Sequence, residues 1–206
     1  VASENGEQYR PQAVDVGPFI QLVSPAGLSI ISDIDDTIKI SQVDNSEAVL
    51  ENTFVKSFRP VPDMAKLYQR YAGRGVVFHY VSGSPWQLYL PLVEFFEAEG
   101  LPRGSFHLKH LRLKEPKTAV TMLKAPKAGK LRDIERLLAD YPQRRFVLIG
   151  DSGEEDVEIY TEVAESHPRQ VLGIFIRNVD ESDISDDRYR QVLPKLDRVD
   201  FRLFRE

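Results

Sequence analysis

The chain of 206 residues contains no cysteine, and this absence excludes disulfide bonds and thiol chemistry. It does not separate a reducing from an oxidising compartment, so the localisation stays open, with a soluble, cytoplasmic or peripheral membrane protein as the expectation. No run approaches the ~18 apolar residues of a membrane-spanning helix, so we predict no transmembrane segment. The net charge of −5 leaves no basic footprint for nucleic acid, and we expect no nucleic-acid partner.

Short apolar runs alternate with helical patterns along most of the chain. Buried strands are predicted at residues 28–32, 75–81, 145–149 and 171–176. Helices are predicted at about 62–72, 85–99, 128–140 and in a stretch ending near 166, before a short final helix and strand. This alternation favours an α/β fold, a Rossmann-like parallel sheet with helices on both faces. Residues 101–127 are predicted to be loop-rich.

We predict two parts in this chain. Residues 1–27 form an N-terminal arm with an edge strand that begins at Pro18, and residues 28–206 form the catalytic domain. Segments 38–60 and 101–127 are polar and would act as small lids, which makes any cap small or absent.

Three carboxylates follow the apolar run at residues 28–32, at Asp33, Asp35 and Asp36. In open α/β sheets, ligands bind just beyond the carboxyl ends of such strands. Crowded carboxylates stay charged only beside positive charge, most simply a divalent cation with oxygen ligands. The sequence therefore predicts a metal-assisted site at the end of the first core strand.

Other polar residues follow the later strands, so their side chains should meet Asp33 at the same edge of the sheet. Ser82 follows the second strand, Asp151 the third and Arg177 the fourth. The segment Gly150-Asp-Ser-Gly-Glu-Glu-Asp adds a second acidic cluster, and carboxylates with substrate phosphate are the ligands that Mg²⁺ prefers. Lys130, near the start of a predicted helix, could bring an ammonium to an anion there, although Lys124 or Lys127 could take that place.

Two alternatives fit the residues poorly. A calcium loop of the EF-hand type requires an aspartate, a glycine and a glutamate at the places where this chain has Thr37, Ile38 and Asp44. A serine-hydrolase elbow requires glycines at the positions of Ser82 and Trp86. The four histidines lack the spacing of zinc ligands.

The motifs carry a resemblance to a known family. The four motifs of the haloacid dehalogenase phosphatase superfamily are matched in order by Asp33-x-Asp35-x-Thr37, Ser82, Lys130, and Gly150-Asp151 through Asp156. More narrowly, three words resemble the catalytic domain of actin-patch-type phosphatidate phosphatases: Ser32-Asp-Ile-Asp-Asp-Thr-Ile-Lys, Val81-Ser-Gly-Ser-Pro-Trp and Gly150-Asp-Ser-Gly-Glu-Glu-Asp-Val-Glu-Ile-Tyr. The resemblance runs from about residue 19 to residue 179 and implies a haloacid dehalogenase-like fold.

The resemblance implies catalytic roles for residues after the first strand. Asp33 would be the nucleophile that forms an aspartyl-phosphate, Asp35 the general acid and then base, and Thr37 the residue that orients Asp35. Ser82, the Gly83 amide and Lys130 would bind the phosphoryl oxygens.

It also implies a Mg²⁺ cofactor, held by Asp33, the main-chain carbonyl of Asp35 and Asp151. Either Glu155 or Asp156 would be the further acidic partner, and we favour Asp156. The implied function is Mg²⁺-dependent hydrolysis of phosphatidate or a related lipid phosphate, with a possible peripheral contact to a membrane. A phosphatase of small soluble phosphomonoesters and a catalytically slow phosphoryl-binding relative stay open as alternatives.

Overall fold

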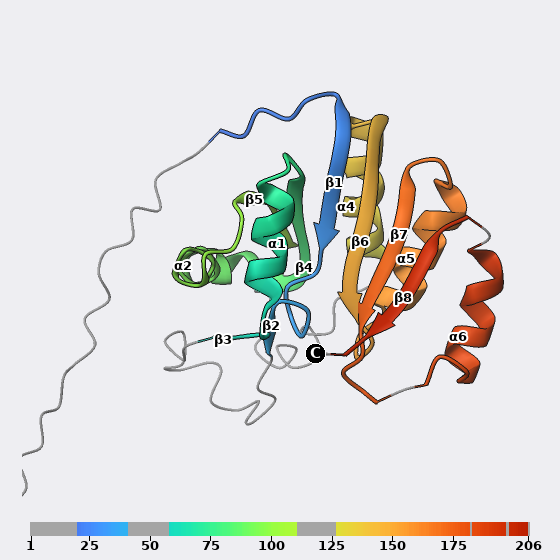
Figure 1. Ribbon diagram of the computed structural model, residues 1–206. Coiled ribbons are helices and arrows are strands. Elements are labelled where there is room, and N and C mark those ends of the chain that lie inside the picture. Colours follow the sequence, from blue (N-terminus) through green and yellow to red (C-terminus); the bar gives the residue numbers. More distant parts are fainter. Residues whose placement is uncertain (1–19, 41–57, 111–126, 182, 197, 206) are drawn as a thin grey trace, which may run out of the picture.

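The computed structural model describes residues 20–40, 58–110, 127–181, 183–196 and 198–205. Six strands form one sheet in which every neighbouring pair is parallel, in the order β5-β4-β1-β6-β7-β8 (Figure 1). Their bounds are β1 Ala26–Ser32, β4 Val77–Pro85, β5 Gly104–Lys109, β6 Gln143–Asp151, β7 Val171–Arg177 and β8 Asp200–Phe204. A separate antiparallel pair consists of β2 Lys39–Ile40 and β3 Arg59–Pro60.

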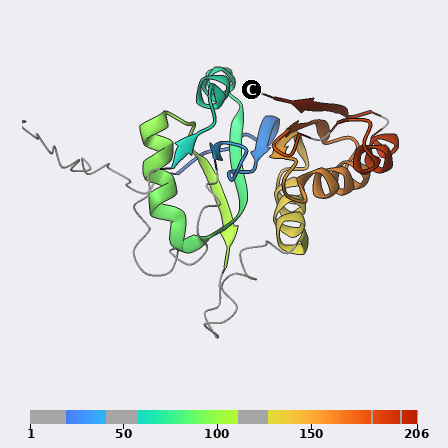
Figure 2. The ribbon, with the colours of Figure 1, turned by 90° about the horizontal axis from the view of Figure 1, so that it is seen from below.

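Helices cover both faces of the sheet (Figure 2). They are α1 Met64–Ala72, α2 Tyr89–Glu99, α4 Lys127–Asp140, α5 Asp156–Ser166 and α6 Asp187–Val192. Successive residues of a strand point to opposite faces, so Ile30 packs with the core under α1 and α2, and Ile31 with the core under α4, α5 and α6. The predicted α/β fold with helices on both faces is thereby confirmed.

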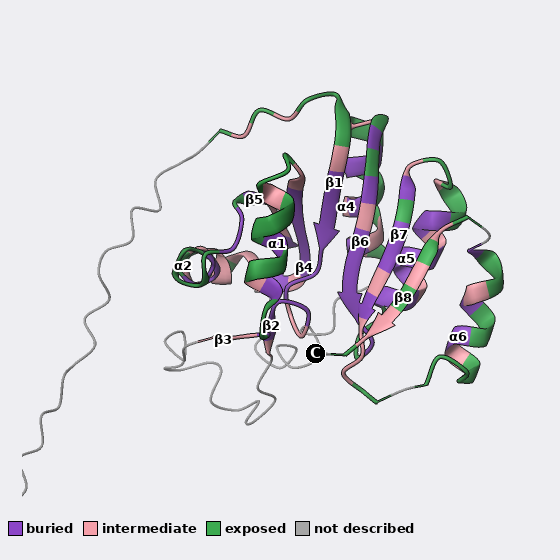
Figure 3. Ribbon diagram, viewed as in Figure 1, coloured by how far each residue is buried: buried purple, intermediate pink, exposed green. Residues whose placement is uncertain are grey.

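The order of the strands places the site. The chain moves outward from β1 through β4 to β5, then returns to β6 on the other side of β1 and continues to β8. Such an order creates a crevice between β1 and β6 at their carboxyl ends, where open α/β sheets bind ligands. Both strands become fully buried toward that end (Figure 3).

The structure corrects two predictions about strands. Residues 104–109, assigned to a loop, form β5, an edge strand that is specified by pairing with β4 rather than by β-branched residues. The predicted edge strand from Pro18 to Val23 is wrong over residues 20–23, which form no strand. Because β1 pairs with β4 on one side and β6 on the other, the segment that leads into it cannot form a strand beside β1.

The remaining predictions of local structure are confirmed or untested. The helices and the other core strands lie where the hydrophobic patterns predicted them, within a few residues. Most of the predicted lids, at residues 41–57 and 111–126, lies outside the described residues, so the size of a cap stays a prediction. No helix in the described ranges is both long and apolar enough to cross a membrane.

Candidate active site

Asp33 and Asp151 lie side by side where the two central strands end. Asp33 directly follows β1, and its backbone N–H donates to the carbonyl of Ile149 on β6 at 2.9 Å. Asp151 is the last residue of β6. Both side chains are completely buried. The pairing of β1 with β6 therefore sets the separation of the two carboxylates.

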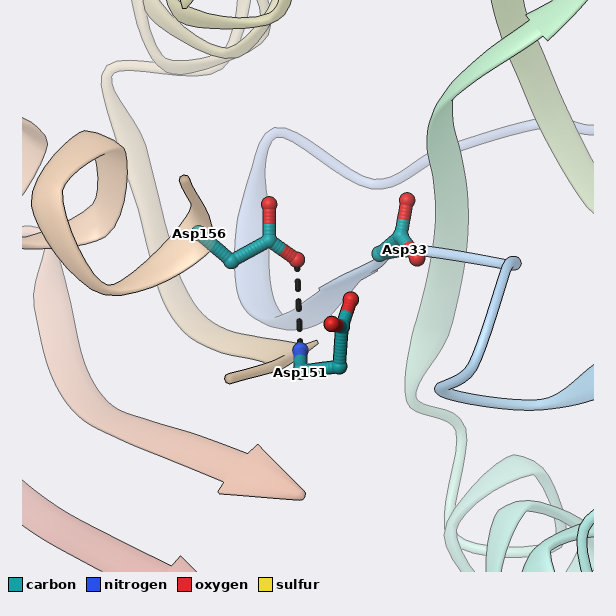
Figure 4. A group of neighbouring side chains, drawn as sticks. All are labelled: Asp33, Asp151 and Asp156. Atoms are coloured by element: carbon teal, nitrogen blue, oxygen red, sulfur yellow. Dashed lines mark hydrogen bonds between the residues drawn. The ribbon is translucent and has the colours of Figure 1, made fainter. Parts of the chain in front are cut away.

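Asp156 completes a cluster of three carboxylates with Asp33 and Asp151 (Figure 4). One oxygen from each lies within 4.8 Å of the others. Asp156 opens α5, and its Oδ2 accepts the backbone N–H of Asp151 at 3.3 Å. A Cβ at Gly150 would lie 2.1 Å from that Oδ2. Glycine at position 150 thus lets Asp156 approach the end of β6.

Lys130 supplies positive charge to this cluster from the first turn of α4. Its Nζ donates to Asp33 Oδ1 at 2.9 Å and makes a very short contact with Asp156 Oδ1. The side chain is buried, and its ammonium lies 5.8 Å from the centre of the Tyr160 ring. Lys130 is therefore brought into the site as predicted. Lys124 and the side chain of Lys127 lie outside the described parts of the chain.

The acidic cluster is electrostatically crowded. Burial raises the pKa of Asp33 well above its usual value, the ammonium of Lys130 lowers it, and the charges of Asp156 and Asp151 raise it further. Burial, followed by the charge of Asp156, raises the pKa of Asp151 to about 7. Burial opposes the charge of Lys130, but Asp156 and Asp33 raise its pKa above the usual value. Three carboxylates sharing one ammonium favour the binding of a further cation.

Two carboxylate oxygens are available to such a cation. Asp33 Oδ2 and Asp151 Oδ2 are buried and have no hydrogen-bond partner among the described residues. Asp151 Oδ1, in contrast, accepts the backbone N–H groups of Gly153 at 2.7 Å and Glu154 at 3.1 Å. Buried carboxylate oxygens without partners are costly unless a ligand occupies them. The donor set fits a hard divalent cation with oxygen ligands.

Asp35 occupies a separate polar cradle. Its Oδ1 accepts Lys39 Nζ at 2.5 Å, and its Oδ2 accepts the hydroxyls of Ser82 at 3.0 Å and Ser84 at 2.6 Å. Burial acts to raise the pKa of Asp35, but the charge of Lys39 and these hydrogen bonds outweigh it and lower the pKa. Asp35 is consequently held as an anion in this geometry.

Sequence reasoning missed two partners of Asp35, although signals for both exist. Ser84 stands two residues after Ser82 in β4, and residues at that spacing share one face of a strand. Lys39 stands four residues after Asp35 in a tight turn, where the N–H of Ile38 donates to the carbonyl of Ile34 at 2.9 Å. Both contacts follow from local geometry.

The other predicted residues divide between the site and its surroundings. Thr37 is buried, and within the described residues its hydroxyl has no partner, so a contact with Asp35 is not made in this geometry. Glu155 is exposed at the start of α5, whereas Asp156 is buried in the cluster. Arg177 Nη1 donates to the carbonyl of Asp36 at 2.8 Å and links β7 to the turn after β1. Gly83 lies in β4 between Ser82 and Ser84.

The arrangement combines parts that phosphoryl transfer requires. A buried carboxylate that can attack is followed two residues later by a second carboxylate; a lysine ammonium donates to the first and serine hydroxyls donate to the second. Catalysis of such transfers consists mostly of positioning and of neutralising negative charge. The cluster with two open carboxylate oxygens provides a place for a cation that does the latter.

Comparison with known proteins agrees with this geometry. The family model described as "Phosphatidate phosphatase APP1, catalytic domain" matches residues 28–178. An uncharacterized protein of Schizosaccharomyces pombe is 36% identical over 157 residues, which cover 74% of this chain and 25% of that protein. Phosphatidate phosphatase APP1 of Saccharomyces cerevisiae is 36% identical over 159 residues, which cover 75% of this chain and 26% of that protein.

The matched region is thus about a quarter of the length of either curated relative. A solved structure, that of a Pnkp1/Rnl/Hen1 complex, superposes with a TM-score of 0.48 at 11% identity, covering 88% of this chain and 58% of that chain. A likeness at this level carries no argument about function.

Proposed function

The chain belongs to the family of the phosphatidate phosphatase APP1 catalytic domain, and on that footing we propose that it is a Mg²⁺-dependent phosphomonoester hydrolase that acts on phosphatidate or a related lipid phosphate. The observation that carries the proposal is the buried cluster of Asp33, Asp151 and Asp156, with two carboxylate oxygens open to a cation. A relative of the chain is named for phosphatidate, which supports the lipid as the first substrate to test.

The cation would be held by Asp33 and Asp151 through their Oδ2 atoms, together with the main-chain carbonyl of Asp35. Bound there, Mg²⁺ would offset the repulsion between the attacking carboxylate and the phosphate dianion. Asp156 would support the site by holding Lys130 and the backbone of Asp151, because each of its oxygens already accepts a hydrogen bond from one of them. A hard cation at carboxylate oxygens is the ground for proposing Mg²⁺.

The reaction would take place in two steps. An oxygen of Asp33 attacks phosphorus, the bond to the leaving oxygen breaks, and Asp35 gives that oxygen a proton. Water then attacks the aspartyl-phosphate, gives its proton to Asp35 and releases phosphate with Asp33 restored. The anionic state of Asp35 suits the second step, whereas the first requires it to be protonated against the charge of Lys39.

Donors around Asp33 would bind the phosphoryl oxygens. The Lys130 ammonium donates a hydrogen bond to Asp33 Oδ1, and the Ser82 hydroxyl donates one to the carboxylate of Asp35. With the Gly83 amide they form the proposed phosphoryl cradle, where negative charge spreads in the transition state. Thr37 is proposed to turn its hydroxyl, which has no partner among the described residues, toward Asp35 during the reaction.

The proposal is tested by hydrolysis of phosphatidate in detergent micelles and of a small soluble phosphomonoester, with and without Mg²⁺. We expect phosphate release from phosphatidate with Mg²⁺ and none after chelation, and peripheral contact predicts faster turnover on anionic vesicles. Robust release only from the soluble ester would replace the lipid by a soluble substrate. Phosphate binding without turnover on either would identify a phosphoryl-binding relative.

A further inference from the structure

Arg188 on α6 contacts the acidic loop that links β6 to α5, although it lies beyond the residues 28–178 matched by the family model. Its Nε and Nη2 donate to the two carboxylate oxygens of Glu158 at 2.7 and 2.8 Å. Nη2 also donates to the carbonyl of Glu154 at 2.5 Å, and Nη1 makes a very short contact with the carbonyl of Ser152. One guanidinium thus joins the loop to the first turn of α5.

The contacted carbonyls belong to the backbone that orients Asp151. The N–H groups of Gly153 and Glu154 hold Asp151 Oδ1, which leaves Oδ2 directed away from the loop and without a partner in the described chain. The carbonyl of Ser152 and the N–H of Gly153 belong to the same peptide group. Arg188 therefore holds one of the two peptide groups whose N–H atoms bind Asp151 Oδ1, and through the carbonyl of Glu154 it also holds the residue that supplies the other N–H.

A second set of contacts fixes the other side of the loop. The Ser152 hydroxyl donates to Asp180 at 2.6 Å and accepts the N–H of Val179 at 2.9 Å. Asp180 also lies 3.8 Å from Arg188 Nη1. The planar guanidinium, with five donors, can make these four hydrogen bonds to a carboxylate and two carbonyls at once, whereas an ammonium has only three donors.

We propose that Arg188 is a positioning residue for the metal site, which holds the Ser152–Glu154 backbone so that Asp151 presents Oδ2 to the cation. The inference rests on the proposed function for the identity of the cation. Groups that orient a metal ligand from outside its coordination sphere commonly change metal affinity by 10-fold or more when mutated. Removing Arg188 should accordingly weaken Mg²⁺ binding in a protein that still folds.

The test compares Arg188→Gln with Arg190→Gln in the full chain. Arg190 lies on the same helix, but it is exposed and pairs only loosely with Asp187, at 3.6 Å, which makes it a matched control for the loss of one positive charge. Mg²⁺ is titrated and followed by calorimetry and by the rise in unfolding temperature, both of which report binding without turnover. We expect the half-saturating Mg²⁺ concentration to rise roughly 10-fold in Arg188→Gln and to stay at the wild-type value in Arg190→Gln.

The outcomes separate this inference from the proposed function. An unchanged half-saturating concentration in Arg188→Gln, with a lower unfolding temperature alone, would mean that Arg188 only stabilises the fold and would overturn the inference. If Mg²⁺ gives neither a calorimetric signal nor a higher unfolding temperature with the wild-type protein, both the proposed metal site and the proposed role of Arg188 are contradicted. If Arg188→Gln does not fold, Arg188→Lys takes its place, with weaker Mg²⁺ binding again the expected result and unchanged binding the contrary one.

Discussion

Two buried polar clusters lie at opposite ends of the central strands β1 and β6, and they differ in how fully their polar groups are paired. At the amino end, the buried Arg144 donates through Nε to Ser29 Oγ at 2.9 Å. Nη1 donates to the carbonyls of Ser24 at 2.7 Å and Ala26 at 2.9 Å, and Nη2 donates to that of Leu28 at 2.5 Å. All three nitrogens of the guanidinium thus have partners.

At the carboxyl end, the ammonium of Lys130 pairs with two of the three clustered carboxylates, those of Asp33 and Asp156, and two oxygens of the cluster lack partners in the described residues. Burial raises the pKa values of Asp33 and Asp151 there, which means that the folded chain opposes their ionisation. A cluster whose polar groups are all hydrogen-bonded stabilises the fold. A cluster with buried carboxylate oxygens that lack partners favours the binding of a positively charged ligand. The difference distinguishes a structural end of the sheet from a functional one.

The largest effect is expected from Asp33→Asn at the carboxyl end. Phosphatase turnover should fall about 10⁴-fold or more because the proposed nucleophile is lost. The free energy of unfolding in the absence of Mg²⁺ should stay the same or rise, because one of three crowded carboxylates is neutralised. Steady-state kinetics and urea unfolding at pH 7 measure the two quantities. Wild-type turnover in this variant would contradict the assigned nucleophile.

The opposite pattern is expected from Arg144→Met at the amino end. Three carbonyls and one hydroxyl lose a buried donor, so the free energy of unfolding should fall by about 3 kcal/mol. Turnover of the folded fraction should hardly change, since Arg144 is distant in the fold from the carboxylates. The exposed neighbour Arg145 provides the control, and Arg145→Met should change stability by less than about 0.5 kcal/mol. A large loss of turnover by folded Arg144→Met would remove the distinction between the two ends.

Arg144 and Arg145 show which parts of the fold could be predicted from the sequence and which could not. The apolar runs located β1, β4, β6 and β7, and the carboxylates at their ends located the site, because both signals are local. Nothing in the dipeptide Arg144-Arg145 tells which guanidinium is buried, since the answer depends on carbonyls of a strand that is distant in sequence. β5 was missed for the same reason: its pairing partner specifies it more than its own composition does.

Gly27, near the start of β1, also depends on a residue that is distant in sequence, Arg144. Gly27 has a φ of 130°, which disfavours other residues, and a Cβ there would lie 3.1 Å from Arg144 Nη1. The close approach of Arg144 is thus a second reason for glycine at this position, besides the backbone conformation.

The smallest expected effect concerns His79, which belongs to the cluster at the amino end of the strands. This residue should make the free energy of unfolding depend on pH. Its Nε2 lies 3.4 Å from Ser29 Oγ and its Nδ1 lies 2.7 Å from Ser105 Oγ. Burial, followed by the charges of His107 and Arg144, lowers the pKa of His79 to about 4. The unfolded chain therefore binds a proton on this side chain at a higher pH than the folded chain does.

Between pH 7 and 5.5, this difference should lower the free energy of unfolding by about 1 kcal/mol, and the loss should continue until the pH reaches the folded pKa. His79→Gln should show a correspondingly shallower dependence on pH over this range, measured by urea unfolding at several pH values. Other titrating groups are common to both proteins and cancel in the difference. Parallel pH profiles for the two proteins would contradict the assignment.

Both clusters also set the time at which the chain can become active. The contact of Arg144 with Ser29 joins residues 115 positions apart, and that of Lys130 with Asp33 joins residues 97 apart. Contacts over such separations form slowly, because a long loop must close before they contribute. During synthesis, Asp33 and Asp35 emerge well before Lys130, Asp151 and β6. Enzymatic activity should therefore appear only when β6 docks beside β1, and its onset is a marker for the joining of these two central strands rather than for folding of either half.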